Sequence, residues 1–158
     1  MYERNYIRNI LGGAYLKKII FAFCLLLLIG CAYLLYEAHQ EKKSLQAQIA
    51  LSARTAMLEA TEHIAFITDD THSYEEKVSH MHALILASYF LRDGNNLSFY
   101  EKGIELNKLA TDYIETPNNH EQTEQQLAQI AAFYTQFEAQ YNSDYQKLYK
   151  AIFETPTK

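Results

Sequence analysis

Hydrophobic residues first gather in one uninterrupted run near the start of the chain. Residues 19–36 read IIFAFCLLLLIGCAYLLY and contain no charged side chain. A helix of that length extends about 27 Å, close to the hydrocarbon thickness of a bilayer. Lys17 and Lys18 lie directly before the run. Because a positively charged flank stays in the cytoplasm, the pattern predicts a span of the inner (plasma) membrane, with residues 1–18 cytoplasmic and 37–158 periplasmic or otherwise extracytoplasmic.

The same run permits a second interpretation, in which the chain is a lipoprotein. Leu28-Ile29-Gly30-Cys31 resembles the lipobox of bacterial lipoproteins, in which the cysteine is lipidated and becomes the new N-terminus. The lysines and the apolar residues before Cys31 would then form the signal peptide. The long segment before the run and the apolar residues after Cys31 favour the uncleaved span. Either anchor would hold the rest of the chain outside the cytoplasm.

Beyond residue 37, apolar residues recur every three to four positions, which is the period of an amphipathic helix. The first predicted helix continues from the apolar run to about Thr68. Its apolar stripe comprises Ala50, Ala53, Met57, Ala60, Ile64 and Ile67. Ser73 and Glu76 have the spacing of a capping box, so a second helix is predicted from there to about Arg92. Its apolar stripe comprises Val78, Met81, Leu84, Ile85, Tyr89 and Leu91.

A third helix is predicted after the turn-forming residues 93–96. Ser98 and Glu101 have the spacing of a second capping box, and Pro117 limits the helix at its other end. Its apolar stripe comprises Phe99, Gly103, Leu106, Ala110 and Tyr113. The sequence therefore predicts a helix of about 18 residues that is much shorter than the first.

The fourth predicted helix covers about residues 120–153, with Asn119 and Gln122 as its cap and Pro156 marking its end. Helices joined by such short loops pack antiparallel, up-down-up-down. The predicted fold class is therefore all-α. A transmembrane helix continues into an extracytoplasmic antiparallel four-helix bundle, in which the first and last helices are long.

The two long helices do not match each other near the membrane. Residues 38–46 read AHQEKKSLQ and are mostly polar, whereas the stretch of the last helix expected opposite them is rich in aromatic residues. Its apolar residues are Tyr141, Tyr145, Leu148, Tyr149, Ile152 and Phe153. Because a polar stalk cannot cover this aromatic face, we expect it to contact a partner protein or the bilayer surface. Pairing of two copies and packing within the domain are the alternatives.

Composition narrows the classes of function. The net charge is −5, and 18 of the 19 acidic residues lie after residue 36, against ten of the 14 basic residues. Because contacts to phosphates need positive charge, we expect no nucleic-acid partner. Cys24 and Cys31 both lie in the apolar run. The exported part therefore has no disulfide, and its stability must come from a hydrophobic core.

Six histidines raise the question of a metal site. Glu59 with His63, and Glu76 with His80, are each four residues apart and so share a helix face. Two facing pairs would offer carboxylate and imidazole ligands for zinc or iron. Di-iron bundles instead use Glu-x-x-His with further glutamates, which this chain lacks. These four residues are therefore weak candidates, and no metal or other cofactor is expected.

No arrangement of a nucleophile with its base, no phosphate-binding loop and no haem-attachment motif stands out in the sequence. We therefore assign no catalytic residue and expect no enzymatic activity. The sequence predicts an envelope protein that binds another envelope or membrane protein in an accessory, assembly or immunity-type role. One alternative is an extracytoplasmic module that binds a small ligand or a metal and acts through a membrane partner. Another is a scaffold of identical copies, joined by a coiled-coil seam along residues 50–67.

Overall fold

The computed structural model describes residues 2–116, 120–141 and 144–154. Every regular element among them is helical, and no strand occurs in these ranges, so the predicted all-α class is confirmed. The chain divides into two compact units, Met1–Lys43 and Ser44–Lys158. Each unit is described separately below.

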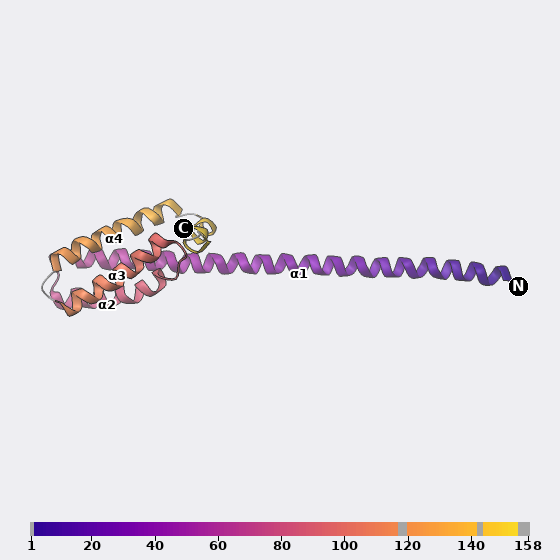
Figure 1. Cartoon of the computed structure of the whole chain (residues 1–158), viewed down its shortest axis with the longest axis horizontal. Coiled ribbons are helices and arrows are strands. Elements are labelled where there is room, and N and C mark those ends of the chain that lie inside the picture. The colour runs from indigo at the N-terminus through magenta and orange to yellow at the C-terminus, as the bar shows by residue number, and fades with distance from the viewer. Residues whose placement is uncertain (1, 117–119, 142–143, 155–158) are drawn as a thin grey trace. The chain divides into compact units, whose positions relative to one another are not determined.

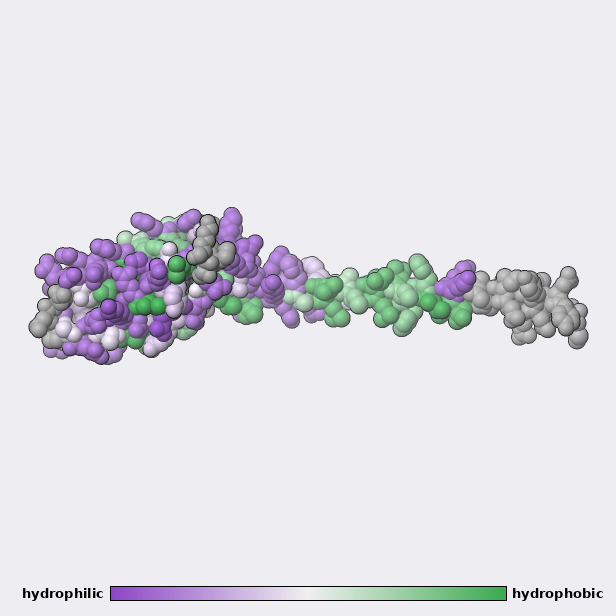
Figure 2. Space-filling model, viewed as in Figure 1, coloured by the Kyte–Doolittle hydropathy of each residue, from purple (hydrophilic) through white to green (hydrophobic). Residues whose placement is uncertain are grey.

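The first unit contains the apolar run. Helix α1 begins at Tyr2 and ends at Ile67, so the run lies within an unbroken helix. Its side chains are exposed along the whole run, with Phe21 at 71% and Leu35 at 73%. Figure 2 shows this stretch as a nearly continuous hydrophobic band. The segment is long and apolar enough to cross a bilayer, and in the part of the chain that the structure describes its most apolar stretch is not buried.

The second unit contains the last part of α1 and the remaining helices. These are α2 (Tyr74–Leu91), α3 (Leu97–Glu115), α4 (His120–Tyr141), the short α5 (Tyr145–Tyr149) and a π-helical turn η1 (Lys150–Glu154). Figure 1 shows α2, α3 and α4 lying along the end of α1. We call residues 44–154 the helical domain.

Contacts between side chains give the directions of neighbouring helices. Asn107 on α3 donates a hydrogen bond to the Ser88 hydroxyl on α2 at 2.8 Å, whereas the Tyr74 hydroxyl lies 3.5 Å from the Ile114 carbonyl. These pairs show that α2 and α3 run antiparallel. The α3–α4 pair is antiparallel as well, since Phe99 contacts Phe137 while Tyr113 stacks on His120.

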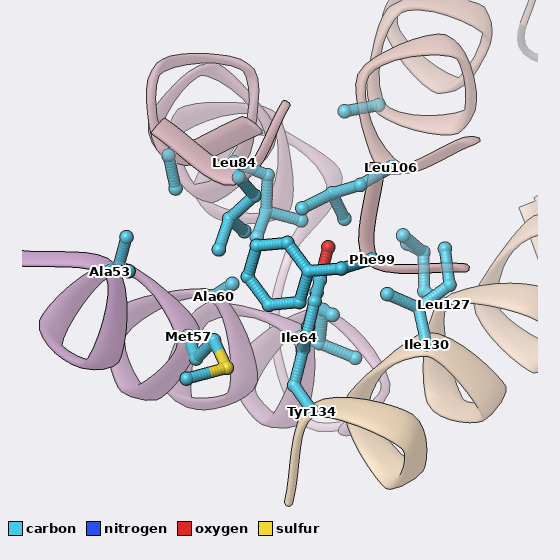
Figure 3. Packing of buried hydrophobic residues seen from close by; sticks show 14 of the residues in the cluster. Ala53, Met57, Ala60, Ile64, Leu84, Phe99, Leu106, Leu127, Ile130 and Tyr134 are labelled. Carbon is cyan, nitrogen blue, oxygen red and sulfur yellow. The ribbon is translucent and has the colours of Figure 1, made fainter. Parts of the chain in front are cut away.

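One hydrophobic core fills the helical domain. All six residues of the predicted α1 stripe expose 3% or less of their surface. Figure 3 shows the Phe99 ring at the centre, facing this stripe from α3, with Leu84 of α2 and Ile130 of α4 nearby. The predicted α3 stripe is also buried. Tyr89, in contrast, is 52% exposed and lies under the Arg92 guanidinium, 4.4 Å from the ring centroid.

The first predicted capping box is confirmed, and the second is wrong. The Ser73 hydroxyl accepts the Glu76 N–H at 3.4 Å, and the Glu76 carboxylate accepts the Ser73 N–H at 2.8 Å. Helix α3 instead begins two residues earlier than predicted, where the Asn96 side chain accepts the Phe99 N–H at 3.1 Å. Asn96 replaces Ser98 as the cap because its side chain also donates to the Ala151 carbonyl, which fixes it at the turn. The predicted cap at Asn119 lies outside the described residues.

The predicted fourth helix over 120–153 is wrong in its length. Helix α4 ends at Tyr141, and the Asp144 side chain caps α5 by accepting the Lys147 N–H at 3.0 Å. The C-terminal segment, residues 144–154, then packs on the turn between α2 and α3. There the Asn96 N–H donates to the Ile152 carbonyl at 2.9 Å.

Gly94 permits this close packing. A Cβ atom at position 94 would lie 2.8 Å from Cγ2 and 3.0 Å from the carbonyl oxygen of Ile152. Asn95 adds a hydrogen bond from its side chain to the Phe153 carbonyl at 2.6 Å. The residues that the sequence marked only as a turn therefore also receive the end of the described chain.

Candidate functional site

The aromatic face predicted to bind a partner is packed within the domain. Leu148 and Ile152 expose 1% and 0% of their surfaces. The other four members, Tyr141, Tyr145, Tyr149 and Phe153, are partly buried against the core. The expectation that this face lies uncovered is therefore wrong. The face is covered because helix α4 ends at Tyr141, so that the C-terminal segment packs on the turn between α2 and α3.

Polar contacts hold this segment to α1. The Arg54 guanidinium donates to the Glu138 carboxylate at 2.7 Å and to the Tyr145 hydroxyl at 3.3 Å. Gln46 also lies 3.3 Å from the Glu154 carboxylate. Gln46 and Arg54 of α1 therefore contact the C-terminal segment, whereas the sequence predicted that the polar residues 38–46 would leave its aromatic face uncovered.

The four weak metal candidates do not converge on one point. The Nδ1 atoms of His63 and His80 lie 2.9 Å apart, as a hydrogen-bonded pair between α1 and α2. Glu76 is occupied in the capping box, and Glu59 lines a groove elsewhere on α1. Among the described residues, no three metal-ligating side chains gather around one position. The two histidines therefore meet, but Glu59 and Glu76 do not come together with them at one point.

A stack of aromatic rings surrounds the histidine pair. Phe66 lies between His72 and His80, with ring centroids 3.5 Å and 3.7 Å away and interplanar angles of 13° and 4°. Burial lowers the pKa of His80, and the neighbouring His63 and His72 lower it further, against an opposing effect of Glu76. We call His63, Phe66, His72 and His80 the histidine cluster.

The largest exposed apolar side chains of the helical domain include two on α2. Leu86 is 65% exposed and Phe90 is 61% exposed, one turn apart on the same side of the helix. Phe90 borders a groove of about 350 Å³ whose other lining residues come from α1: Leu51, Ser52, Thr55, Ala56 and Glu59. Leu86, Phe90 and these groove residues form what we call the α1–α2 face.

Sequence reasoning missed this face because it followed a single stripe along α2. Residues 83–91 read ALILASYFL, in which Ser88 is the only polar side chain before the tyrosine. A helix that is apolar on all sides is either buried on all sides or exposes part of its apolar surface. With Leu84 and Leu91 in the core, Leu86 and Phe90 must point elsewhere. The composition of this stretch was the signal that could have found the face.

A polar cleft of about 560 Å³ lies at the end of the domain where α1 is joined to α2 and α4 begins. Its lining residues are Asp70, His72, Tyr74, Lys77, Tyr113, His120, Glu121 and Glu124. The rings of Tyr74, Tyr113 and His120 are nearly parallel, with centroids 4.1–6.0 Å apart. The cleft therefore combines aromatic surfaces with an excess of carboxylates.

A buried charge network forms the floor of this cleft. The Lys77 ammonium, whose side chain is 9% exposed, donates to the Glu124 carboxylate at 2.9 Å. The Tyr113 hydroxyl donates to the same carboxylate oxygen at 3.0 Å. Burial and the hydrogen bond to Glu124 raise the pKa of Tyr113. Glu124 is therefore paired, while Asp70 and Glu121 are exposed at the rim.

Comparison with protein families, curated proteins and solved structures gives no match for this chain. A proposal on function must therefore be argued from the geometry of the α1–α2 face, the cleft and the histidine cluster.

Proposed function

We propose that the chain is a membrane-anchored envelope protein, without enzymatic activity, that binds a partner protein through the α1–α2 face. In this proposal residues 19–36 span the inner membrane and residues 1–18 remain in the cytoplasm. Residues 37–158 lie on the other side, where the helical domain is an antiparallel four-helix bundle. The apolar, fully exposed run with lysines before it supports the span and its direction.

The exposure of Leu86 and Phe90 is the observation that carries the partner-binding role. Burying a side chain of this size stabilises a complex by about 1.5–3 kcal/mol, so leaving two of them in water forgoes a substantial gain. Ser52, Thr55 and Ala56 have small side chains and line the groove next to them. Small residues let another helix approach closely, so the partner element we propose is a helix with an apolar face.

A partner in or near the same membrane is within reach of this face. The groove begins at Leu51, only fifteen residues after the end of the apolar run at Tyr36. Apart from Glu59, its lining residues are uncharged. A helix of a membrane protein that extends beyond the bilayer has the apolar surface that such a groove would bind.

The test is gentle extraction of the full chain from its own membrane, followed by native mass spectrometry. We expect a stoichiometric partner protein that is lost from Phe90→Ser and from Leu86→Ser. Ile104→Ser is the matched control, because Ile104 is also an exposed apolar residue, at 41%, but lies on α3. A bare monomer, or equal loss of the partner in the control, would contradict the proposal. A complex of two copies would show that the partner is a second copy of this chain. A lipid-modified chain beginning at Cys31 would show that the anchor is a lipid and not a membrane-spanning helix.

The cleft supports a second candidate function, the binding of a small organic cation. Its carboxylates Asp70, Glu121 and Glu124 exceed its one ammonium group, and Tyr74, 41% exposed, offers an aromatic face to a cation. Putrescine at 100 times its Kd would add about 2.7 kcal/mol to the free energy of unfolding. The neutral 1,4-butanediol is the control ligand. No difference between the two in the melting temperature would remove this candidate.

A further inference from the structure

The histidine pair contains one hydrogen between two ring nitrogens. His63 and His80 meet through Nδ1 at 2.9 Å, with their ring planes at 74° and their centroids 4.9 Å apart. At this distance one Nδ1 must donate its N–H while the other accepts with its lone pair. We assign His80 as the acceptor, because burial and its neighbours His63 and His72 disfavour the charged form of its ring. Its neutral ring then carries its hydrogen on Nε2.

Protonation affects this pair in two distinct steps. A first proton on Nε2 of His63 leaves its Nδ1–H in place and strengthens the hydrogen bond to His80. A second proton must occupy Nδ1 of His80. Two N–H groups would then point at each other, and both rings would carry positive charge. The hydrogen bond between α1 and α2 cannot survive the second step.

Other charged groups near the pair act in both directions. Glu76, on the same helix face as His80, favours the charged imidazole, whereas His63 and His72 disfavour it. His72 has its own carboxylate neighbour, since its Nε2 lies 3.8 Å from Asp69. Glu76 is held by the Ser73 N–H and hydroxyl at 2.8 Å each, so it is not free to move toward His80. Lys77, the next residue on α2, pairs with Glu124.

Phe66 links the pair to the loop between α1 and α2. Its ring is stacked between His80 on α2 and His72 in the loop. Movement of the His80 ring would leave one face of the Phe66 ring without its stacking partner. The end of α1, the loop and the start of α2 are therefore joined through these four side chains.

We propose that the histidine cluster is an acid-sensitive latch, which holds the end of α1 against α2 near neutral pH and releases it when His63 and His80 are both protonated. The proposal does not rest on partner binding or on the cleft. The trigger is the proton itself, in a compartment whose pH the cytoplasm would not control if the domain is extracytoplasmic. The moving parts are residues 60–67 of α1, the loop 68–73 and the first half of α2.

The direction of the pH effect follows from the pKa of His80, which is lowered in the folded domain. Between that lowered pKa and the ordinary value of about 6.5, the unfolded chain binds the proton that the folded chain excludes. The contribution of the latch is therefore fully present above pH 6.5. It is lost as the pH falls through the pKa of folded His80.

Hydrogen–deuterium exchange on the full chain in detergent micelles tests the latch. Protection factors, corrected for the intrinsic pH dependence of exchange, are compared at pH 7.5 and pH 5.0. We expect amides in 60–67 and 77–84 to lose at least tenfold in protection at pH 5.0, whereas amides in 103–110 of α3 change less than twofold. His63→Gln and His80→Gln should abolish the difference, since neither variant can place two charges in the pair.

His82→Gln is the matched control on the same helix. His82 is exposed, and its ring nitrogen contacts the Val78 carbonyl of its own helix at 2.9 Å. This variant should keep the full pH response, and an equal response in all variants would overturn the latch. If His63→Gln and His80→Gln fail to fold, the pH dependence of the histidine ring chemical shifts in the unaltered chain is the test. A His80 ring that titrates at the ordinary histidine pKa, or unchanged protection in the unaltered chain at pH 5.0, would also overturn it.

Discussion

Replacing Tyr134 with phenylalanine should stabilise the helical domain, although it removes a polar group from the core. Tyr134 is fully buried, and its hydroxyl has no hydrogen-bond partner among the described residues. Figure 3 shows its side chain directed into the core toward Phe99, and the two rings meet edge to face with centroids 5.7 Å apart. Burial raises the pKa of the Tyr134 hydroxyl, and Glu105 contributes to the same shift.

The magnitude follows from two opposing effects of the substitution. An unpaired hydroxyl in the core costs about 1–3 kcal/mol in lost hydration, which phenylalanine does not incur. The space left by one oxygen atom costs roughly 0.3 kcal/mol at the measured dependence on cavity volume. Tyr134→Phe should therefore raise the free energy of unfolding by about 1 kcal/mol or more. For a domain of this size, the melting temperature would rise by about 4 °C.

Tyr113→Phe is the matched control, because the same atom is removed from a tyrosine with a partner. Tyr113 is 2% exposed, and its hydroxyl donates to the Glu124 carboxylate at 3.0 Å. A hydrogen bond to a charged group contributes about 1.5–3 kcal/mol, so this variant should be destabilised by an amount in that range. The two substitutions are chemically identical and should have opposite signs.

Chemical denaturation of the full chain in one mild detergent, followed by circular dichroism at pH 7.5, measures both free energies of unfolding. The refuting result is a Tyr134→Phe variant that is destabilised by 1 kcal/mol or more. That loss would mean that the hydroxyl has a partner, such as a buried water, in the folded protein. Equal effects of the two variants would show that the position of the hydroxyl in the core does not matter.

Three further substitutions, two of them paired with a control variant, test details of the fold in the same denaturation assay. Ser73→Ala should lower the free energy of unfolding by about 1 kcal/mol, because Ser73 caps α2, whereas Ser98→Ala should lower it by only a few tenths of that amount. Equal losses would show that Ser98 caps α3 after all. Gly103→Ala should cost about 1–3 kcal/mol, since its Cβ would lie 2.8 Å from the Leu91 carbonyl, whereas Gly30→Ala has open space and should leave the domain unchanged. Ile152→Ala should lower the free energy of unfolding by about 2–5 kcal/mol, because Ile152 is fully buried. A loss below about 0.5 kcal/mol would show that the C-terminal segment lies exposed on the surface.

The sequence predicted best those features that depend on residues close together in the chain. The stripe from Ala50 to Ile67 is buried because a 3.6-residue period places its members on one face, whatever packs against it. The Ser73–Glu76 box forms within four residues and needs no other element. Such local signals predicted the helices of the domain and most of its core.

Features that depend on distant residues were not predictable in the same way. Ser98 and Asn96 are both good caps, and the choice between them depends on the Ala151 carbonyl, which is 55 residues away. The break after Tyr141 is accompanied by a good cap at Asp144, but the apolar period continues across it and favours one helix. The packing of Ile152 against Gly94 decides the path, and no pattern within either segment indicates that pairing.

For the candidate sites too, features within one helix were predictable, whereas contacts between helices were not. The spacing of Glu59 with His63 and of Glu76 with His80 predicted which residues share a helix face. It did not predict that only the histidines would meet, because that depends on how far α1 and α2 are shifted along each other. The exposed position of Leu86 and Phe90 was within reach of the sequence, since a helix that is apolar on every side needs more than one partner surface.

The α1–α2 contact joins the two proposals, and one measurement separates them. The histidine cluster and the groove lie along the same pair of helices, and Glu59 of the groove is one turn before His63 on α1. If release of the latch lets the helices move apart, the groove changes its width, and binding of the partner should weaken at least tenfold between pH 7.5 and pH 5.0. His63→Gln should bind equally at both values, with His82→Gln responding as the unaltered chain does. Affinity that stays constant while hydrogen exchange accelerates would restrict the latch to its own end of the domain. Affinity that falls equally in His63→Gln would place the pH dependence in the partner, because this chain would then carry no second charge in the pair.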